Sequence, residues 1–173
     1  EILSGLVGSE MCIRDRWSNV ENQYQRRLDL IPNLVNTVKG YASHEENTLT
    51  EVVNARAKAT QMQLNIDQLD EATLKKLSNV QGELSSALSR LMAISENYPD
   101  LKANQNFLDL QAQLEGTENR IAVERRKFND VARSYNAFIL QFPRNLVAGM
   151  FGFTSKPYFE ANAGAENAPK VEF

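Results

Sequence analysis

The feature that most constrains this chain is a row of large apolar residues that recurs every seven positions. Its members are Phe107, Leu114, Ile121, Phe128, Tyr135 and Phe142. A second row lies half a repeat away, with Leu110, Val131 and Phe138 as its large apolar members. A seven-residue repeat places each row on one side of a helix. The pattern therefore predicts one helix over residues 107–142, about 54 Å long at about 1.5 Å per residue, with partner helices along its length.

Shorter rows of the same kind predict three further helices. They cover residues 17–42, 44–63 and about 70–98, and each carries an apolar face with a helical period. Gly40 and Ser43 favour a break between the first two. The repeat nevertheless continues through that point, so one long bent helix stays open as an alternative. The predicted fold is an all-α, antiparallel four-helix bundle with long heptad-patterned helices.

Local signals predict how these helices begin and bend. Pro32 should kink the first helix and free the Leu28 carbonyl, with Arg27, Asn33 and Asn36 close enough to bond it. Ser43 and Glu46 fit a capping box for the second helix. Asp67 or Asp70 can cap the third, and Asn104 can cap the long one.

The two ends of the chain differ from the middle. Residues 1–16 share neither the repeat nor the composition of the neighbouring helix and resemble translated sequencing-adaptor read-through, so we expect them to be artefactual or disordered. Residues 17–160 form the expected bundle, which closes with an irregular segment carrying Phe151, Phe153, Tyr158 and Phe159. We expect this segment to fold back across the open end of the bundle, and residues 161–173 to be a flexible tail.

Composition excludes several classes of function. The net charge is −3 with acids and bases interspersed, so no nucleic-acid-binding footprint is present, and we interpret Arg26-Arg27 and Arg125-Arg126-Lys127 as solvated helix faces. Cys12 is the only cysteine, which excludes an intramolecular disulfide. No window approaches the ~20 apolar residues of a membrane-spanning helix. We therefore expect the chain as written to be soluble.

The sequence contains no recognisable catalytic apparatus. A metal-binding bundle needs two Glu-x-x-His pairs, whereas His44 is the only histidine and Tyr41 occupies the position three residues before it. An HExxH site fails because position 48 is Thr. We predict no catalytic residue, no metal and no cofactor, and a protein that is not an enzyme.

The candidate site residues form a polar interruption in the long helix. Glu118, Glu124 and Arg125 stand on the second row, where apolar residues are expected, and Glu118 and Arg125 are seven apart. A buried ion network that fixes helix register would explain them, and a ligand cavity inside the bundle is the alternative. Asn129 and Asn136, also seven apart, suggest interhelical hydrogen bonds or a partner-binding edge.

From Trp17 onward the chain closely resembles the LemA family. The resemblance is carried by these stretches: QRRLDLIPNLV (25–35), VKGYA (38–42), YPDLKAN (98–104), LEGTENRI (114–121), and FP, NLVAG, GF and YFE between residues 142 and 160. It implies an antiparallel four-helix bundle in the bacterial cell membrane, anchored by one N-terminal transmembrane helix. It supplies no established activity. The departure is the unmatched start of this chain, where family members carry the anchor.

The sequence supports two hypotheses for function. The first is a non-enzymatic, membrane-tethered helical scaffold of the bacterial envelope that binds other proteins, with its natural anchor absent from this chain. The second is a receptor that binds a small molecule or peptide at the polar layer. A cavity of several hundred Å³ at that layer would favour the receptor, and tightly paired side chains would favour the scaffold.

Overall fold

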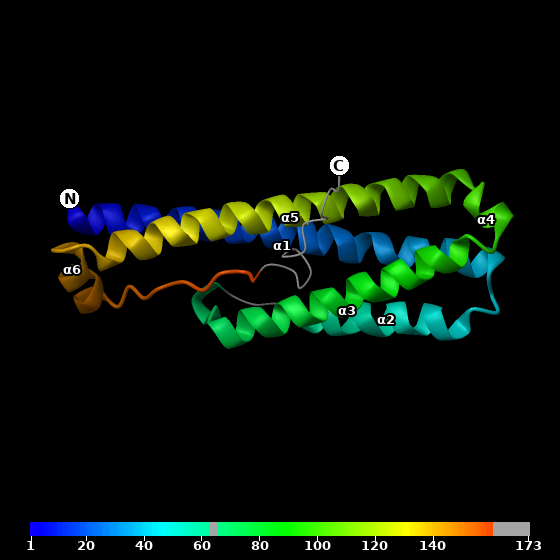
Figure 1. The fold of residues 1–173 in the computed structure, drawn as a ribbon, viewed down its shortest axis with the longest axis horizontal. Helices are drawn as coiled ribbons and strands as arrows, with labels where there is room; N and C mark the ends of the chain where they lie inside the picture. The colour runs from blue at the N-terminus through cyan, green and yellow to red at the C-terminus, as the bar shows by residue number, and fades with distance from the viewer. Residues whose placement is uncertain (63–65, 161–173) are drawn as a thin grey trace, which may run out of the picture.

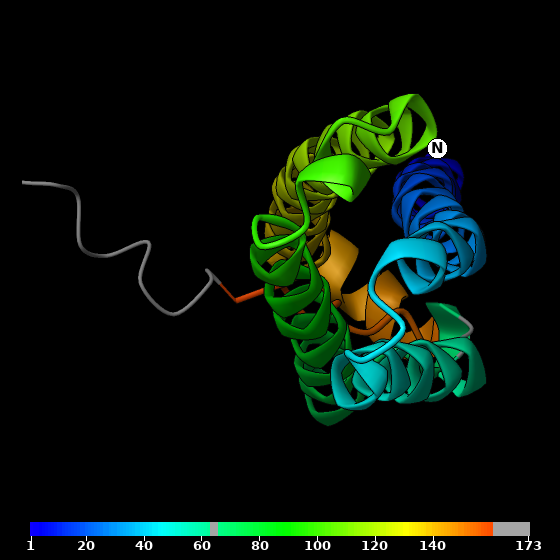
Figure 2. The same ribbon diagram turned by 90° about the vertical axis from the view of Figure 1, so that its right-hand side faces the viewer.

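The computed structural model, which describes residues 1–62 and 66–160, confirms the all-α fold. Its helices are α1 (Ile2–Tyr41), α2 (Glu46–Gln61), the 3₁₀ turn η1 (Ile66–Gln68), α3 (Glu71–Ser95), α4 (Pro99–Lys102), α5 (Gln105–Leu140) and α6 (Arg144–Phe151). The described residues contain no strand. Helices α1 and α5 form a long antiparallel pair, and the shorter α2–α3 hairpin packs beside the part of it that lies away from the N-terminus (Figure 1). Viewed from one end, α1, α2, α3 and α5 are arranged in a ring (Figure 2).

The predicted break after the first helix is confirmed. Helix α1 ends at Tyr41 and α2 begins at Glu46, so a single bent helix is excluded. The predicted capping box is wrong, because Glu45 is the N-cap residue of α2 and makes no side-chain capping bond. Other caps are as expected: the Asp70 carboxylate accepts the Thr73 N–H, and the Asn104 side chain accepts the Phe107 N–H at 3.0 Å. Those caps satisfy amides that the first helical turn leaves without a partner.

Helix α1 continues through Pro32, and its freed carbonyl is satisfied from another helix. Arg56 Nε on α2 donates to the Leu28 carbonyl at 3.0 Å. The sequence favoured Arg27, Asn33 or Asn36 as the donor to the Leu28 carbonyl, because these residues are its neighbours along the chain. A proline inside a helix removes one internal hydrogen bond. Here the bond is replaced by one that ties α1 to α2.

Residues 1–16 differ from the expectation made for them. They form the first turns of α1, and Leu6 and Ile13 are fully buried. A β-carbon at position 5 would lie 3.2 Å from the Phe138 ring of α5, so the glycine allows that ring to pack closely against α1. The spacing explains the difference, because Leu6, Ile13 and Val20 continue the seven-residue step of α1 upstream of Trp17. The predicted tail at 161–173 lies outside the described residues.

The hydrophobic core consists of two clusters. One cluster joins the C-terminal half of α1 to α2, α4, the second half of α3 and the start of α5. The other joins the N-terminal half of α1 to η1, the start of α3, the second half of α5, α6 and Phe159. The buried polar residues Arg27, Gln81 and Thr117 lie between the two clusters in sequence on α1, α3 and α5. A layer of buried polar residues therefore divides the core, and its members differ from the predicted Glu118, Glu124 and Arg125.

The irregular C-terminal segment takes a different path from the one expected. After α6, Gly152 adopts a left-handed conformation with φ of 76°, and the chain turns back. Residues 153–160, here called the strap, then run along α5 towards the middle of the molecule and reach η1 and the start of α3 (Figure 1). Of the four aromatic residues of the C-terminal segment, only Phe159 is buried, Phe153 is half-buried, and Phe151 and Tyr158 are exposed. The expectation that all four aromatics cover the end of the bundle is wrong.

Candidate functional site

The polar layer is organised around Arg27, which is 1% exposed. Its Nη1 bonds the Glu118 carboxylate of α5 and donates to Ser85 Oγ of α3 at 2.8 Å. Its Nη2 donates to the Gln81 carbonyl at 3.3 Å and bonds the Gln81 side-chain oxygen. One guanidinium therefore connects α1, α3 and α5. Because an arginine presents several donors in a fixed plane, one side chain of α1 can bond residues of both α3 and α5.

The prediction that Arg27 lies on a solvated face is wrong. A signal was available, since Val20, Arg27 and Leu34 step by seven and all three are buried. Gln81 occupies the equivalent place on α3, between the buried Leu74 and Leu88. A heptad row locates a core position whatever residue fills it. The two rows were missed because Arg27 and Gln81 are polar and interrupt the apolar repeat.

Two further residues complete the layer. Thr117 is fully buried, and its hydroxyl donates to the Gln113 carbonyl one turn earlier at 2.7 Å. Tyr24 places its ring 5.8 Å from the Arg27 guanidinium. Burial raises the pKa of the Tyr24 phenol, and the nearby charges of Arg125 and Arg27 oppose that rise. The phenol therefore stays neutral beside the ion pair.

Glu118, Glu124 and Arg125 do not form one network. Glu118 pairs with Arg27, whereas Glu124 pairs with Lys127 of the same helix at 2.8 Å. Arg125 lies over the Phe159 ring, 4.7 Å from its centroid, and donates to the Glu160 carbonyl at 3.2 Å. The partner of Glu118 is on another helix, so the seven-residue spacing of Glu118 and Arg125 did not indicate a shared partner. Arg125 belongs to the contacts of the strap.

Asn129 and Asn136 hold the strap by its backbone. The Asn129 amide donates to the Phe159 carbonyl at 2.9 Å and accepts the Phe159 N–H at 2.7 Å. The Asn136 amide makes the same pair of bonds with Lys156, both at 2.8 Å, and donates to the Tyr158 hydroxyl at 2.7 Å. Each amide thus makes the two backbone hydrogen bonds that a neighbouring strand would make to an extended segment in a sheet. We call this pair the asparagine clamp.

The spacing of the clamp matches the geometry of an extended chain. Seven residues of helix separate the two asparagines, about 10.5 Å at about 1.5 Å per residue. Three residues separate Lys156 from Phe159, about 9–10 Å at roughly 3.1–3.3 Å per residue in extended backbone. The two repeats coincide closely enough for both amides to reach a backbone N–H and C=O. The sequence left interhelical hydrogen bonds or a partner-binding edge open for Asn129 and Asn136, and the bonds observed in the structure run instead to the backbone of the strap.

An aromatic cluster anchors the end of the strap. The Phe159 ring stacks on Trp17 of α1 with centroids 6.0 Å apart and meets Phe128 of α5 edge to face at 5.5 Å. Trp17 and Phe128 also meet edge to face at 5.6 Å. Such pairs add to the stabilisation from burial alone. The first residue of the LemA resemblance therefore packs directly against the last aromatic of the strap.

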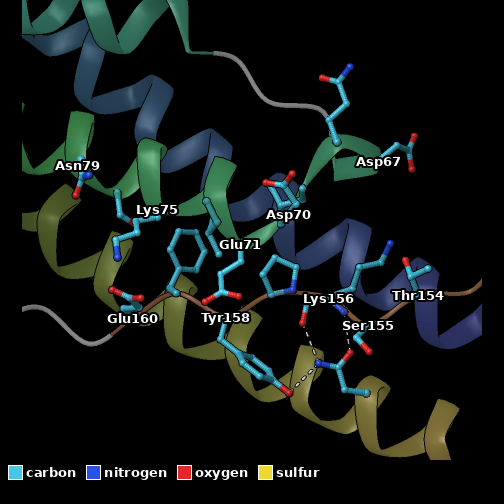
Figure 3. Close-up of a pocket in the computed structure, with 17 residues that line it drawn as sticks. Asp67, Asp70, Glu71, Lys75, Asn79, Thr154, Ser155, Lys156, Tyr158 and Glu160 are labelled. Carbon is cyan, nitrogen blue, oxygen red and sulfur yellow. Dashed lines mark hydrogen bonds between the residues drawn. The ribbon is translucent and has the colours of Figure 1, made fainter.

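A cavity of about 770 Å³ lies between the strap and the segment formed by η1 and the start of α3 (Figure 3). Its charged side chains are of both signs: Asp67, Asp70, Glu71 and Glu160 are acidic, and Lys75 and Lys156 are basic. The dashed lines in Figure 3 mark the bonds of the clamp to Lys156 and Tyr158. Of the predicted site residues, Asn136 lines this cavity.

A smaller cavity of about 300 Å³ lies among α1, α2 and α3. Trp17, Tyr24 and Gln81 line it, so it borders the Arg27 network through Gln81. Glu21 lies at this cavity, and burial raises the pKa of its carboxyl. Glu118, Glu124 and Arg125 are not among the lining residues.

Metal-binding clusters and membrane-spanning helices are both absent from the described ranges. Within residues 1–62 and 66–160, no group of three or more His, Cys, Asp or Glu residues is placed to hold a metal ion. His44 is exposed in the turn between α1 and α2. Among the same residues, no helix combines the length and the apolar character needed to cross a bilayer.

The fold and the polar layer define a class of long, heptad-patterned helical bundles whose interior charges are paired within the chain. The sequence profile of the LemA family matches residues 16–173, and the chain belongs to that family. The match begins one residue before Trp17, where the resemblance in the sequence also begins. The segment upstream lies outside it.

Curated relatives agree with this assignment. The chain is 32% identical to magnetosome protein MamQ 1 of Paramagnetospirillum magneticum, over 83% of this chain and 59% of that protein. It is 30% identical to magnetosome protein MamQ of Magnetospirillum gryphiswaldense, covering 82% and 58%. It is 25% identical to protein LemA of Metamycoplasma hominis, covering 87% and 65%. The chain therefore spans less than two thirds of the length of these relatives.

Proposed function

We propose that this chain is the helical domain of a membrane-tethered scaffold of the bacterial envelope, which binds other proteins and does not convert a substrate. The observation that carries the proposal is the pairing of the buried Arg27 guanidinium, through both of its Nη atoms, with residues of other helices. Arg27 is bound by Glu118, Gln81 and Ser85, so the charges at the centre of the bundle are engaged in holding the helices together. An arginine engaged in this way is accounted for by contacts within the chain, which supports a structural role for the layer.

The tether is the second part of the proposal. The LemA resemblance implies one transmembrane helix before the bundle, and the matched relatives are longer than this chain. In the proposed arrangement the anchor precedes α1 and holds the bundle beside the membrane. At about 1.5 Å per residue, the 40 residues of α1 would extend about 60 Å from that anchor.

Affinity capture from membranes tests this function, with a version that carries its natural N-terminus. Wild type should be compared with Arg27→Met/Glu118→Met, which replaces the ion pair by apolar side chains and should leave the fold intact. A scaffold should retain the same partner proteins in both versions. Loss of every partner in a double variant that remains folded would contradict the proposal, because the polar layer would then be the binding site.

A receptor for a small molecule or peptide is the second candidate. The cavity of about 300 Å³ supports it, since Gln81 lines the cavity and also binds Arg27. A ligand there could act on the network that connects α1, α3 and α5. Screening metabolites and short peptides by thermal shift tests this candidate, with Gln81→Leu as the variant that should abolish the shift. Thr60→Ser, at the same cavity but away from the network, is the matched control.

A further inference from the structure

The end of the molecule that contains α6 carries a dense group of exposed apolar side chains. Leu140, the last residue of α5, is 71% exposed, and Phe142, two residues later, is 80% exposed. Leu146, Met150 and Phe151 of α6 are 58%, 81% and 59% exposed. We call these five residues the apolar tip. Single exposed apolar residues need no explanation, but five within twelve positions of the chain form an exposed surface of the kind that marks an interaction site.

The tip has the pattern of an amphipathic helix that lies on a surface. On α6, Met150 and Phe151 follow Leu146 by four and five positions, and all three side chains are exposed. Val147 and Ala148 face the core. Gly152 ends α6 in a left-handed turn, and Phe142 lies two residues before the start of α6. Large flexible and aromatic side chains on one face of a short helix can enter the boundary between lipid head groups and acyl chains.

The charges around the tip favour an anionic lipid surface. Residues 134–158 contain no Asp or Glu, and their charged members are Arg144 and Lys156. The Arg144 guanidinium lies 4.1 Å from the centroid of the Phe138 ring and bonds the Gln141 side chain at 2.6 Å. Lys156 is paired with Glu10 of α1 at 3.6 Å, so these two charges balance each other and Arg144 supplies the positive charge of this segment. Basic residues beside inserted apolar side chains add electrostatic attraction to anionic lipids.

The position of the tip agrees with this occupant. The start of α1 and α6 lie at the same end of the molecule (Figure 1), and α1 contacts α6. We propose that the apolar tip seats on the surface of an anionic lipid bilayer, so that α6 lies in the membrane interface. The orientation rests on the proposed function, since an anchor preceding α1 would hold this end against the membrane. The binding itself needs no anchor and is testable with the chain as it stands.

Vesicle sedimentation tests the proposal directly. The chain should bind vesicles of phosphatidylcholine with phosphatidylglycerol more tightly than vesicles of phosphatidylcholine alone, and salt should weaken the binding. Phe142→Ser/Met150→Ser/Phe151→Ser should reduce the affinity by about tenfold or more. The matched control is Tyr41→Ser/Val53→Ser/Leu108→Ser, which changes three exposed apolar residues outside the tip and should bind like wild type.

A fluorescent label locates the contact. In a Cys12→Ser background, an environment-sensitive dye on Met150→Cys should shift to the blue when the vesicles are added, and the same dye on Val53→Cys should not. Equal binding by the tip and control triple variants would overturn the proposal. The proposal would also be overturned if wild type bound no vesicles but self-associated as its concentration rose, and the tip variant did not self-associate. The tip would then join two copies of the chain. Neither result bears on whether the anchored protein captures partner proteins, which the affinity-capture experiment tests by itself.

Discussion

Arg27 of α1 and Glu118 of α5 form an ion pair in which one partner is far more buried than the other. The arginine side chain is 2% exposed and the glutamate side chain is 42% exposed. Removing the glutamate would leave a buried positive charge, whereas removing the arginine would leave a carboxylate that water can reach. The two single substitutions should therefore differ in cost.

Glu118→Gln should lower the free energy of unfolding by about 2 kcal/mol, below the roughly 3–5 kcal/mol of a fully buried pair because the carboxylate is partly solvated. Arg27→Met should cost less, since a similar apolar volume replaces the buried charge. Denaturant unfolding of both variants measures the order. Glu115→Gln, an exposed residue on the same helix, is the control and should stay within about 0.5 kcal/mol of wild type. The reverse order would show that the arginine stabilises mainly by its hydrogen bonds.

The asparagine clamp should release the strap when its donors are removed. Asn129→Asp and Asn136→Asp keep an acceptor for the strap N–H groups but place a carboxylate oxygen against a backbone carbonyl. Hydrogen exchange of the Lys156 and Phe159 amides should become faster. The fluorescence of Trp17, the only tryptophan, should change as Phe159 leaves it.

The control for the clamp is Asn119→Asp, an exposed asparagine on the same helix. It adds the same charge without touching the strap. If it changes exchange at Lys156 and Phe159 as much as the clamp variants do, then the added charge and not the lost hydrogen bonds accounts for the effect.

Tyr135 should make the protein less stable in alkali. Burial, together with the charge of Glu10, raises the pKa of the Tyr135 phenol to about 12, while an unfolded tyrosine ionises near pH ~10. Between these values the unfolded chain loses the proton and the folded chain keeps it, so stability falls as the pH rises through this window. Tyr135→Phe should reduce that fall, measured as the thermal midpoint against pH. An identical pH profile in the variant would assign the loss to another group.

The start of α1 gives a direct test of residues 1–16. Ile13→Ala should cost roughly 2–4 kcal/mol because Ile13 is fully buried. Met11→Ala, two positions earlier and 64% exposed, should cost less than about 0.5 kcal/mol. Equal and negligible effects in denaturant melts would mean that this part of α1 does not contribute to the stability of the bundle, as the sequence pattern alone suggested.

The sequence by itself determined the fold class and most of the helix boundaries. Seven-residue rows such as Phe107 to Tyr135 report burial through spacing alone, and caps such as Asp70 and Asn104 act within four residues of the chain. Both kinds of signal are local. The break near Ser43 and the polar interruption at Glu118 were predictable for the same reason.

Only the tertiary structure decided which polar residues meet. Arg27 and Glu118 are 91 positions apart, Arg56 reaches Leu28 from the next helix, and Asn129 reaches Phe159 across 30 positions. A repeat fixes the face on which a residue lies, but not the rotation and offset of the helices that face it. Those are set by packing, and they place Arg27 between α3 and α5 and the strap along α5. Residues that spacing identified as polar thus acquired their partners from the arrangement of the whole bundle.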